Sequence, residues 1–265
     1  MEWNFFNLNS QLCDNLCAKF KAPTEIQQKV LVYTSSKVDL IIQARTGEGK
    51  TLCYAIPIVN YILNFYERSE EMIKKISPVA LILVPTRELG VQVKKHIEDI
   101  IFDKNTKKNL YQIKIAEVLG GFAKPKQIRI LNKAHPEIII ATPGRLWEII
   151  ENEESDLLDK LNKMKFLVID EADRMTETGH FKELKNIIEH VYSRIEVKDE
   201  VEGNIKEKVE KFGEGINKDE DIEENEKIAK KIGVKVEDIE TIDPIELMKD
   251  NAKFGDIEME ELDEE

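Results

Sequence analysis

Short apolar runs alternate with segments of helical length between residues 38 and 192, and this alternation restricts the fold of the 265-residue chain more than any other feature. Each run is rich in Val, Ile and Leu, as strands buried on both faces of a parallel sheet are. Strand–helix–strand units in series place helices on both faces of such a sheet. The expected strands are Val38–Ile42, Ala80–Val84, Ile113–Val118, Glu137–Ala141 and Phe166–Ile169.

The intervening segments have the apolar spacing of amphipathic helices. The sequence therefore predicts an α/β domain at residues 37–192, preceded by a helical extension at residues 1–36. The expected helices are Leu8–Phe20, Thr24–Tyr33, Lys50–Asn64 and Glu88–Ile101.

Residues 193–265 differ in character from the rest of the chain. They hold 12 Lys and Arg against 26 Asp and Glu, whereas residues 1–192 hold 27 and 26, so the net charge of −13 comes from the tail. No strand pattern recurs there, and we expect a disordered or transiently helical acidic segment. The alternative is an interaction segment for basic proteins. The near-neutral domain remains compatible with a nucleic-acid partner.

Several classes of protein are disfavoured by composition. No run of eighteen apolar residues is present, so we expect no membrane association. The start of the chain lacks the pattern of a secretion signal. Cys13, Cys17 and Cys53 have no His or Cys partners at zinc spacing, and we interpret them as reduced thiols of a cytosolic or nuclear protein.

A phosphate-binding loop is predicted between the first strand and the helix that follows it. Gly47 and Gly49 let the backbone curl so that successive N–H groups point at phosphate oxygens. Lys50 supplies a charge for the β- and γ-phosphates, and Thr51 a hydroxyl for Mg²⁺. The alternative is a glycine-rich turn before an amphipathic helix. The candidate nucleotide-binding residues here are Ala44, Arg45, Thr46, Gly47, Glu48, Gly49, Lys50 and Thr51.

Carboxylates follow the last expected strand. Asp170 stands at its C-terminal end, the edge at which open α/β sheets bind ligands, and we expect it to hold Mg²⁺. Glu171 comes next and is positioned to polarise the attacking water. Lys50, Asp170 and Glu171 are therefore the candidate catalytic residues. The alternative is a capping cluster for the next helix.

With the phosphate loop, the sequence Asp170-Glu171-Ala172-Asp173 resembles the DEAD-box ATP-dependent RNA helicases. The resemblance implies a RecA-like phosphate-loop domain that uses ATP and Mg²⁺, with Asp173 coupling two lobes. Residues 20–27 resemble the adenine-reading Q motif, in which Phe20 stacks on the purine and Thr24 and Gln27 contact the nucleotide.

Other segments match the family's RNA-contacting motifs in the same order. Helix N-termini, a Thr hydroxyl and Arg side chains after strands are suitable ligands for a sugar-phosphate backbone, which carries little sequence information. The implied RNA-binding residues are Pro85, Thr86, Arg87, Gly120, Gly121, Thr142, Pro143, Gly144 and Arg145.

Three further segments resemble a nucleolar subgroup that acts in assembly of the large ribosomal subunit. They are residues 91–97, residues 136–148 and residues 173–184, the last with Gly179-His180-Phe181. This implies a monomer that acts in the nucleolus on pre-ribosomal RNA, with ribosome-assembly proteins as partners. Without the subgroup, the cytoplasm is the expected location.

The resemblance covers only the first lobe of such an enzyme. No Ser-Ala-Thr motif and no second RecA-like domain occur up to Glu265, so a fragment and an interrupted insertion both remain open. We expect the isolated chain to be nearly inactive. Two rivals remain: a DNA helicase of the same superfamily, and a nucleotide-dependent RNA-binding or scaffold module without turnover.

Overall fold

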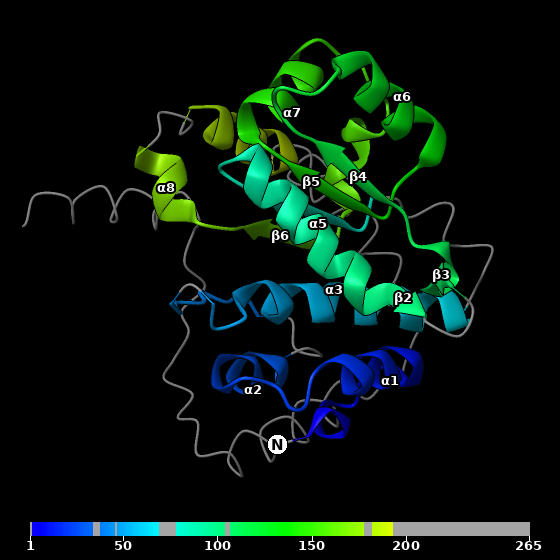
Figure 1. Cartoon of the computed structure of the whole chain (residues 1–265). Coiled ribbons are helices and arrows are strands. Elements are labelled where there is room, and N and C mark those ends of the chain that lie inside the picture. The colour runs from blue at the N-terminus through cyan, green and yellow to red at the C-terminus, as the bar shows by residue number, and fades with distance from the viewer. Residues whose placement is uncertain are drawn as a thin grey trace, which may run out of the picture.

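The computed structural model describes residues 2–33, 38–45, 47–68, 78–103, 107–177 and 182–192. Expectations for Thr46, for Gly179-His180-Phe181 and for the acidic tail at residues 193–265 lie outside this part of the chain. The described residues form a four-stranded sheet in the order β4–β5–β1–β6, with every neighbouring pair parallel (Figure 1). The predicted α/β fold is confirmed.

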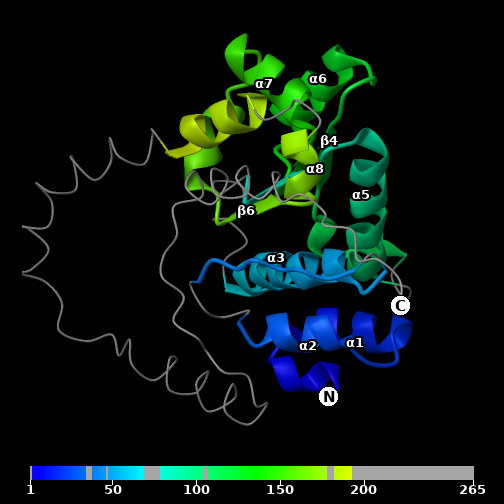
Figure 2. The same cartoon turned by 90° about the vertical axis from the view of Figure 1, so that its left-hand side faces the viewer.

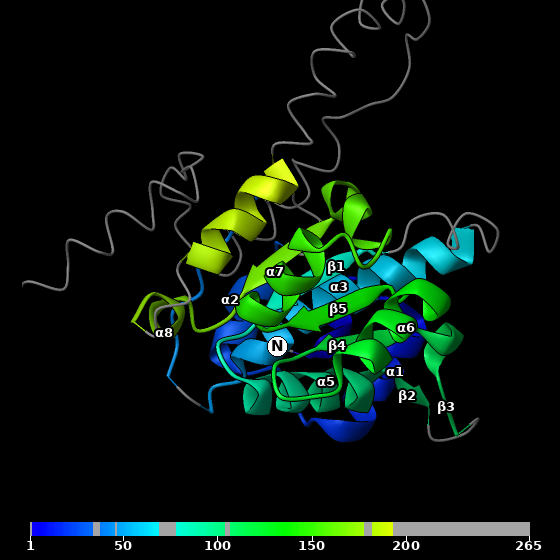
Figure 3. The same ribbon diagram turned by 90° about the horizontal axis from the view of Figure 1, so that it is seen from above.

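Hydrogen-bond register aligns the carboxyl ends of all four strands. Leu83 pairs with Ala141 on one side and with Ile169 on the other, and Val118 also pairs with Ala141. Seen from above, β5 lies between β1 and β4 (Figure 3). The residues that follow these strands therefore share one edge of the sheet. The strands are β1 (Ala80–Leu83), β4 (Ile115–Val118), β5 (Ile138–Ala141) and β6 (Phe166–Ile169), with a separate antiparallel pair of β2 (Phe102–Asp103) and β3 (Lys108–Asn109).

All four expected helices are present, with ends shifted by a few residues. Local signals set several ends: Thr24 and Thr86 accept hydrogen bonds from backbone N–H groups in the first turns that follow them. None of the helices in the described ranges is long and apolar enough to cross a membrane. The helices are α1 (Ser10–Lys19), α2 (Glu25–Leu31), α3 (Lys50–Arg68), α5 (Arg87–Ile101), α6 (Lys124–Ala134), α7 (Pro143–Glu151), α8 (Ala172–Glu177) and residues 182–192, with 3-10 turns at Trp3–Phe6, Leu110–Gln112 and Leu158–Lys163.

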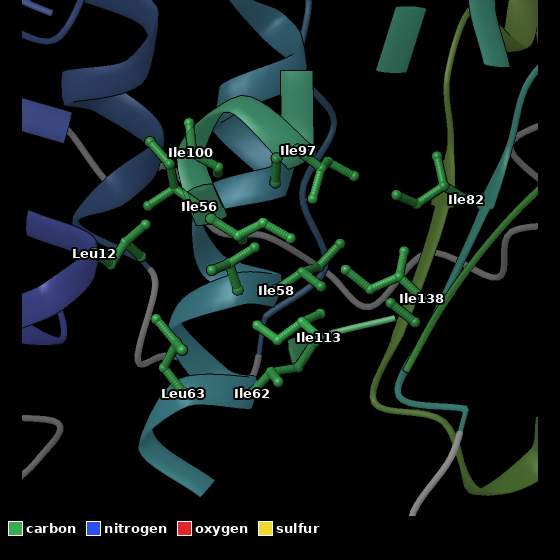
Figure 4. Packing of buried hydrophobic residues seen from close by; sticks show 14 of the residues in the cluster. Leu12, Ile56, Ile58, Ile62, Leu63, Ile82, Ile97, Ile100, Ile113 and Ile138 are labelled. Carbon is green, nitrogen blue, oxygen red and sulfur yellow. The ribbon is translucent and has the colours of Figure 1, made fainter. Parts of the chain in front are cut away.

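Two apolar cores lie on opposite faces of the sheet, because successive strand residues point to opposite faces. Ala80 and Ile82 of β1 belong to the core shared with α3 and α5, whereas Leu81 and Leu83 belong to the core shared with α7 and residues 182–192. In the first core, Ile56 and Ile58 of α3 lie among side chains from the sheet and from neighbouring helices (Figure 4). Burial of such side chains stabilises the fold by about 1.5–3 kcal/mol each.

The N-terminal helices α1 and α2 form a further layer beneath α3 (Figure 2). Polar contacts hold this layer in addition to apolar packing. The Asn9 backbone N–H donates to Oδ1 of Asn60 at 2.7 Å, and Nδ2 of Asn15 donates to the Ile100 carbonyl at 2.9 Å. The helical extension is thus attached directly to α3 and α5.

One strand prediction is wrong. Val38–Ile42 forms no strand, and residues 38–45 run as coil with Ile41 74% exposed. Strand formation needs a hydrogen-bonded neighbour as well as apolar, β-branched side chains. Within the described chain, the sheet ends at β6, which pairs with β1 alone. The phosphate loop is consequently held by contacts other than a preceding strand.

Candidate active site

The candidate phosphate loop runs directly into α3, which begins at Lys50. Gly47 and Gly49 have φ of +90° and +91°, a conformation that glycine adopts without strain. A Cβ at Gly49 would lie 2.4 Å from Nε2 of Gln27, whereas a Cβ at Gly47 would meet nothing within 4 Å. Position 49 therefore requires glycine for both backbone conformation and space, and position 47 for conformation alone.

Two hydrogen bonds join Arg45 and Glu48, which stand on either side of Gly47 in the loop. The Arg45 backbone N–H donates to Oε2 of Glu48 at 2.9 Å, and the Glu48 N–H donates to the Arg45 carbonyl at 3.3 Å. Ala44 is half-buried and lies in coil. The Glu48 carboxylate therefore occupies the Arg45 N–H, one of the donors predicted to face phosphate oxygens.

Thr24 and Gln27 hold the loop against α2. The Thr24 hydroxyl donates to the Glu48 carbonyl at 2.9 Å, and Nε2 of Gln27 donates to the Gly49 carbonyl at 3.1 Å. Oε1 of Gln27 accepts the Thr24 backbone N–H at 2.9 Å, which completes a capping box. A side-chain amide has two donors and two acceptor sites, so each polar atom of Gln27 has the capacity for one further bond, although the residue is buried, with 3% of its surface exposed.

Phe20, the expected stacking residue, packs beside Trp3. Their ring centroids are 6.2 Å apart with planes tilted by 56°, and Nε1 of Trp3 donates to the Phe20 carbonyl at 3.1 Å. Phe20 is half-buried against the apolar core, so part of its surface remains exposed for a purine.

Asp170 is joined to α3 through Tyr54. The Asp170 backbone N–H donates to the Leu83 carbonyl at 2.9 Å, which fixes this residue at the carboxyl end of β6. The Tyr54 hydroxyl donates to Oδ2 of Asp170 at 2.7 Å. Burial, and then the adjacent Asp170 carboxylate, raise the pKa of Tyr54, so the phenol stays protonated as the donor. Tyr54, three residues after Thr51 on α3, thus connects the helix of one predicted metal ligand to the side chain of the other.

Glu171 has a left-handed backbone, with φ of +51°, immediately before α8. Such a conformation costs a non-glycine residue about 1–3 kcal/mol and is often found at functional sites. Its Oε2 accepts from Nη1 of Arg174 at 2.9 Å, and both side chains are partly exposed. Asp173 is exposed in the first turn of α8, where its Oδ1 accepts the Arg174 backbone N–H at 2.9 Å.

The donor set fits Mg²⁺ held jointly with a nucleotide. Thr51 and Asp170 supply oxygen donors, and magnesium in proteins is bound by one or two carboxylates together with substrate phosphates. In the described part of the chain, no group of three or more His, Cys, Asp or Glu residues is placed to hold a metal ion.

The first two predicted RNA motifs meet at the common sheet edge. Thr86 caps α5 by accepting the Leu89 N–H at 3.2 Å, and the Arg87 side chain lies over Gly121. A Cβ on Gly121, whose φ is +82°, would come within 2.7 Å of Nη1 of Arg87. Nε of Arg87 also contacts Oε1 of Glu88 at 2.6 Å in an exposed ion pair, which raises the Arg87 pKa. Arg87 thus remains accessible to a phosphate.

The third motif is tied to the second. The Thr142 hydroxyl accepts the Gly120 N–H at 3.0 Å. Nη1 of Arg145 donates to the Phe122 carbonyl at 2.9 Å and to Oε1 of Gln127 at 3.0 Å, and its Nε pairs with Oε2 of Glu148 at 3.1 Å. Arg145 therefore braces this edge of the domain from within.

Within the same set, Pro85 and Pro143 are buried, so they shape the turns after β1 and β5. Gly144 differs, since a Cβ there would meet nothing within 4 Å. Only part of the predicted RNA track is consequently surface that a ligand can touch.

Sequence reasoning missed Tyr54 and Gln127. Tyr54 lies three residues after Thr51 on α3, and its hydroxyl interrupts an otherwise apolar face, which was the available signal. Gln127 is buried and links Arg145 to the Leu119 carbonyl, to which its Nε2 donates at 2.8 Å. A single glutamine within an amphipathic helix gives no comparable signal.

Comparison with known proteins agrees with this geometry. Residues 24–204 match the DEAD/DEAH box helicase family over more than half of the chain. The chain belongs to this family.

Its relatives include the ATP-dependent RNA helicase MAK5 of Coccidioides immitis, 42% identical over 213 residues, which cover 78% of this chain and 26% of that protein. The ATP-dependent RNA helicase ddx24 of Dictyostelium discoideum is 38% identical over 224 residues, covering 71% of this chain and 23% of the relative. The chain thus spans about a quarter of the length of these relatives. Among solved structures, the yeast DEAD-box splicing factor Prp28 matches with a TM-score of 0.60 and 29% identity, over 72% of this chain and 42% of that one.

Proposed function

We propose that this chain is the ATP-binding first lobe of an ATP-dependent RNA helicase. The observation that carries the proposal is the hydrogen bond from the Tyr54 hydroxyl to Asp170, which brings the helix after the phosphate loop and the carboxyl end of β6 into one site. An NTPase needs a phosphate cradle and a metal carboxylate in this proximity. The names of the relatives, each an ATP-dependent RNA helicase, support the same activity.

Within this proposal each residue has a distinct task. Gly47 and Gly49 shape the loop for phosphate oxygens, and Lys50 adds a positive charge beside them. Thr51 and Asp170 hold Mg²⁺, which when bound neutralises charge that develops on the phosphates. Glu171 orients and polarises the attacking water.

Adenine recognition is assigned to α2 and the segment before it. The buried Gln27 amide has the capacity for one further donated and one further accepted bond at the base edge, and Phe20 offers the exposed part of its ring. Because the same amide holds Gly49, base recognition and loop conformation are coupled.

RNA is expected along the edge formed by residues 85–87, 120–121 and 142–145. Thr86, Arg87 and the free N-terminal N–H groups of α5 and α7 suit phosphate and sugar oxygens. Such contacts read the backbone, so affinity should depend strongly on salt and weakly on sequence.

Similarity to MAK5 and ddx24 also supports the predicted subgroup. On that basis the chain would act on pre-ribosomal RNA in the nucleolus together with ribosome-assembly proteins, and Asp173 would couple this lobe to a second one.

The proposal is tested by titrating the 265-residue chain into a fluorescent ATP analogue, with and without Mg²⁺. We expect Mg²⁺-dependent binding that falls by more than about tenfold in Lys50→Ala, since a phosphate–lysine contact contributes on the order of 1.5–3 kcal/mol. Lys95→Ala, an exposed lysine on α5, is the matched control and should bind as the parent does. A parent without Mg²⁺-dependent binding, or equal loss in both variants, would refute the assignment.

A second candidate is a nucleotide-dependent RNA-binding module without turnover. Its support is that the chain spans about a quarter of its relatives, while an arginine from another lobe contributes about 10³–10⁵ to rate in related NTPases. ATP hydrolysis by the chain, measured with RNA, with DNA of the same sequence and without nucleic acid, separates the candidates. Stimulation of ATP hydrolysis by RNA but not by DNA supports the RNA helicase lobe. Nucleotide binding without hydrolysis supports the RNA-binding module.

A further inference from the structure

The Tyr54 hydroxyl binds one of the two predicted metal ligands and comes from the helix that carries the other. It donates to Oδ2 of Asp170 at 2.7 Å, and Tyr54 stands three residues after Thr51 on α3. Tyr54 and Thr51 belong to α3, whereas Asp170 follows β6, so this hydroxyl is a direct polar connection between the two halves of the site.

Packing fixes the direction of this hydroxyl. The Tyr54 ring lies against the apolar core beneath the sheet, next to buried neighbours on α3 such as Ala55 and Ile58. An aromatic ring held in this way has little rotational freedom, so its single polar atom points to one place. The hydroxyl therefore constrains Asp170 more strongly than a flexible side chain would.

Asp170 has a second restraint in its backbone N–H bond to Leu83. With the backbone fixed and Oδ2 bound by Tyr54, the rotation of the carboxylate is set and its Oδ1 is oriented. Groups that hold a metal-ligating carboxylate in this manner typically change metal affinity by 10–100-fold when they are removed.

We propose that Tyr54 is a positioning residue, which orients the Asp170 carboxylate so that it can hold Mg²⁺ together with Thr51 on α3. The inference rests on the proposed function, because it concerns the same metal site. It assigns to Tyr54 a role in Mg²⁺ affinity that is separate from any contribution of its ring to packing.

The same helix provides a matched control. The Tyr66 hydroxyl, also on α3, donates to Oε1 of Glu137 at 2.7 Å. Glu137 is buried at the opposite end of β5 from Thr142 and also accepts the Lys114 N–H at 2.8 Å. Tyr54→Phe and Tyr66→Phe thus each delete one hydroxyl that binds a carboxylate, and only the first lies at the candidate site.

The experiment titrates Mg²⁺ against fluorescent ADP bound to the 265-residue chain and records thermal midpoints in parallel. In Tyr54→Phe we expect the half-saturating Mg²⁺ concentration to rise about tenfold, while ADP affinity at saturating Mg²⁺ changes by less than about twofold. The thermal midpoint should fall by similar amounts in Tyr54→Phe and Tyr66→Phe, whereas the Mg²⁺ dependence of Tyr66→Phe should stay that of the parent. Both variants retain their rings, so packing is preserved.

Asp170→Asn completes a double-mutant cycle, because asparagine keeps an acceptor for Tyr54 and removes the charge. If Tyr54 acts through Asp170, Tyr54→Phe has no further effect on Mg²⁺ in this background. An unchanged Mg²⁺ requirement in Tyr54→Phe, an equal shift in Tyr66→Phe, or additive effects in the cycle would each overturn the inference. If the parent itself binds ADP without regard to Mg²⁺, the proposed function fails instead.

Discussion

Nε2 of Gln27 donates a hydrogen bond to the Gly49 carbonyl at 3.1 Å, and this bond joins α2 to the loop that precedes α3. The Thr24 hydroxyl adds a second bond, to the Glu48 carbonyl. The segment expected to read adenine and the loop expected to hold phosphates are therefore one connected unit. A change at Gln27 should alter both base selectivity and phosphate binding.

Gln27→Glu tests this coupling, since it replaces a donor by a carboxylate that faces the Gly49 carbonyl. Loss of the bond and the new repulsion should weaken ATP binding by about tenfold or more and remove any preference over GTP. Titrations with fluorescent ATP and GTP analogues measure both effects. Gln28→Glu is the control, because Nε2 of Gln28 also donates to a backbone carbonyl, that of Pro23 at 3.0 Å. Equal losses in the two variants would contradict a special role for Gln27.

Alanine at the two loop glycines separates strain from steric contact. Gly47→Ala adds a Cβ in open space at φ of +90°, so we expect a cost of about 1 kcal/mol from the backbone alone. Gly49→Ala adds the same strain and a contact with Gln27 at 2.4 Å, so it should lose more stability and most nucleotide affinity. Thermal midpoints and nucleotide titrations rank the variants. Gly144→Ala, on α7 in open space, should be neutral or stabilising.

Two arginines of the predicted RNA edge should behave differently. Arg87 is paired with the exposed Glu88, so Arg87→Ala should leave stability unchanged. It should weaken RNA binding and reduce the magnitude of the slope of log affinity against log salt concentration by about one. Arg145→Ala leaves the Phe122 carbonyl and Oε1 of Gln127 without this partner and should cost about 1–3 kcal/mol of stability. Thermal unfolding and salt-dependent RNA binding measure the contrast. An RNA-binding defect in Arg145→Ala with unchanged stability would assign it to direct contact.

Thiol reactivity tests the burial of the three cysteines, because burial raises a thiol pKa. Burial raises the pKa of Cys53 to about 11, and burial together with the neighbouring Cys17 raises that of Cys13 to about 11. At pH 7.5 such thiols are about 0.03% thiolate, so a maleimide should modify the exposed Cys17 first. A raised folded-state pKa contributes stability that is present below the ordinary thiol pKa of 9.0 and is lost as pH rises toward about 11. Mass spectrometry of partly labelled chain checks the order, and rapid labelling of Cys53 in the folded state would contradict its burial.

Much of the domain was predictable because its signals are local. β1, β4, β5 and β6 are short apolar runs, and α3 and α5 have a clear helical period. Thr24 and Thr86 cap the helices α2 and α5. The one strand that failed, Val38–Ile42, is similarly rich in Val, Ile and Leu. A strand also needs a hydrogen-bonded neighbour, and pairing between distant segments is not encoded in a five-residue window.

In the candidate site too, local motifs were predictable and contacts between distant elements were not. The residue types of the phosphate loop and of Asp170–Asp173 are recognisable from their spacing alone. The sequence did not show that Gln27 binds Gly49, that Arg145 braces Gln127 from within or that Tyr54 reaches Asp170. Each of these is a contact between elements that are distant in sequence, and the choice of partner is made by packing.

Glu171→Gln tests the chemical step. Glutamine keeps the size of the side chain and an acceptor for Arg174, but it removes the charge that polarises water. Nucleotide affinity should stay within about twofold of the parent, whereas phosphate release in a single turnover should fall by about 10²–10⁴. The matched variant is Arg174→Ala, which removes the ion pair and leaves the Glu171 carboxylate, so turnover should persist. Both side chains are partly exposed, so neither change should alter the thermal midpoint much. Hydrolysis by Glu171→Gln at the parent rate would show that another group activates the water. Equal loss in the two variants would show that the ion pair, and not the carboxylate charge, sets the geometry of the step.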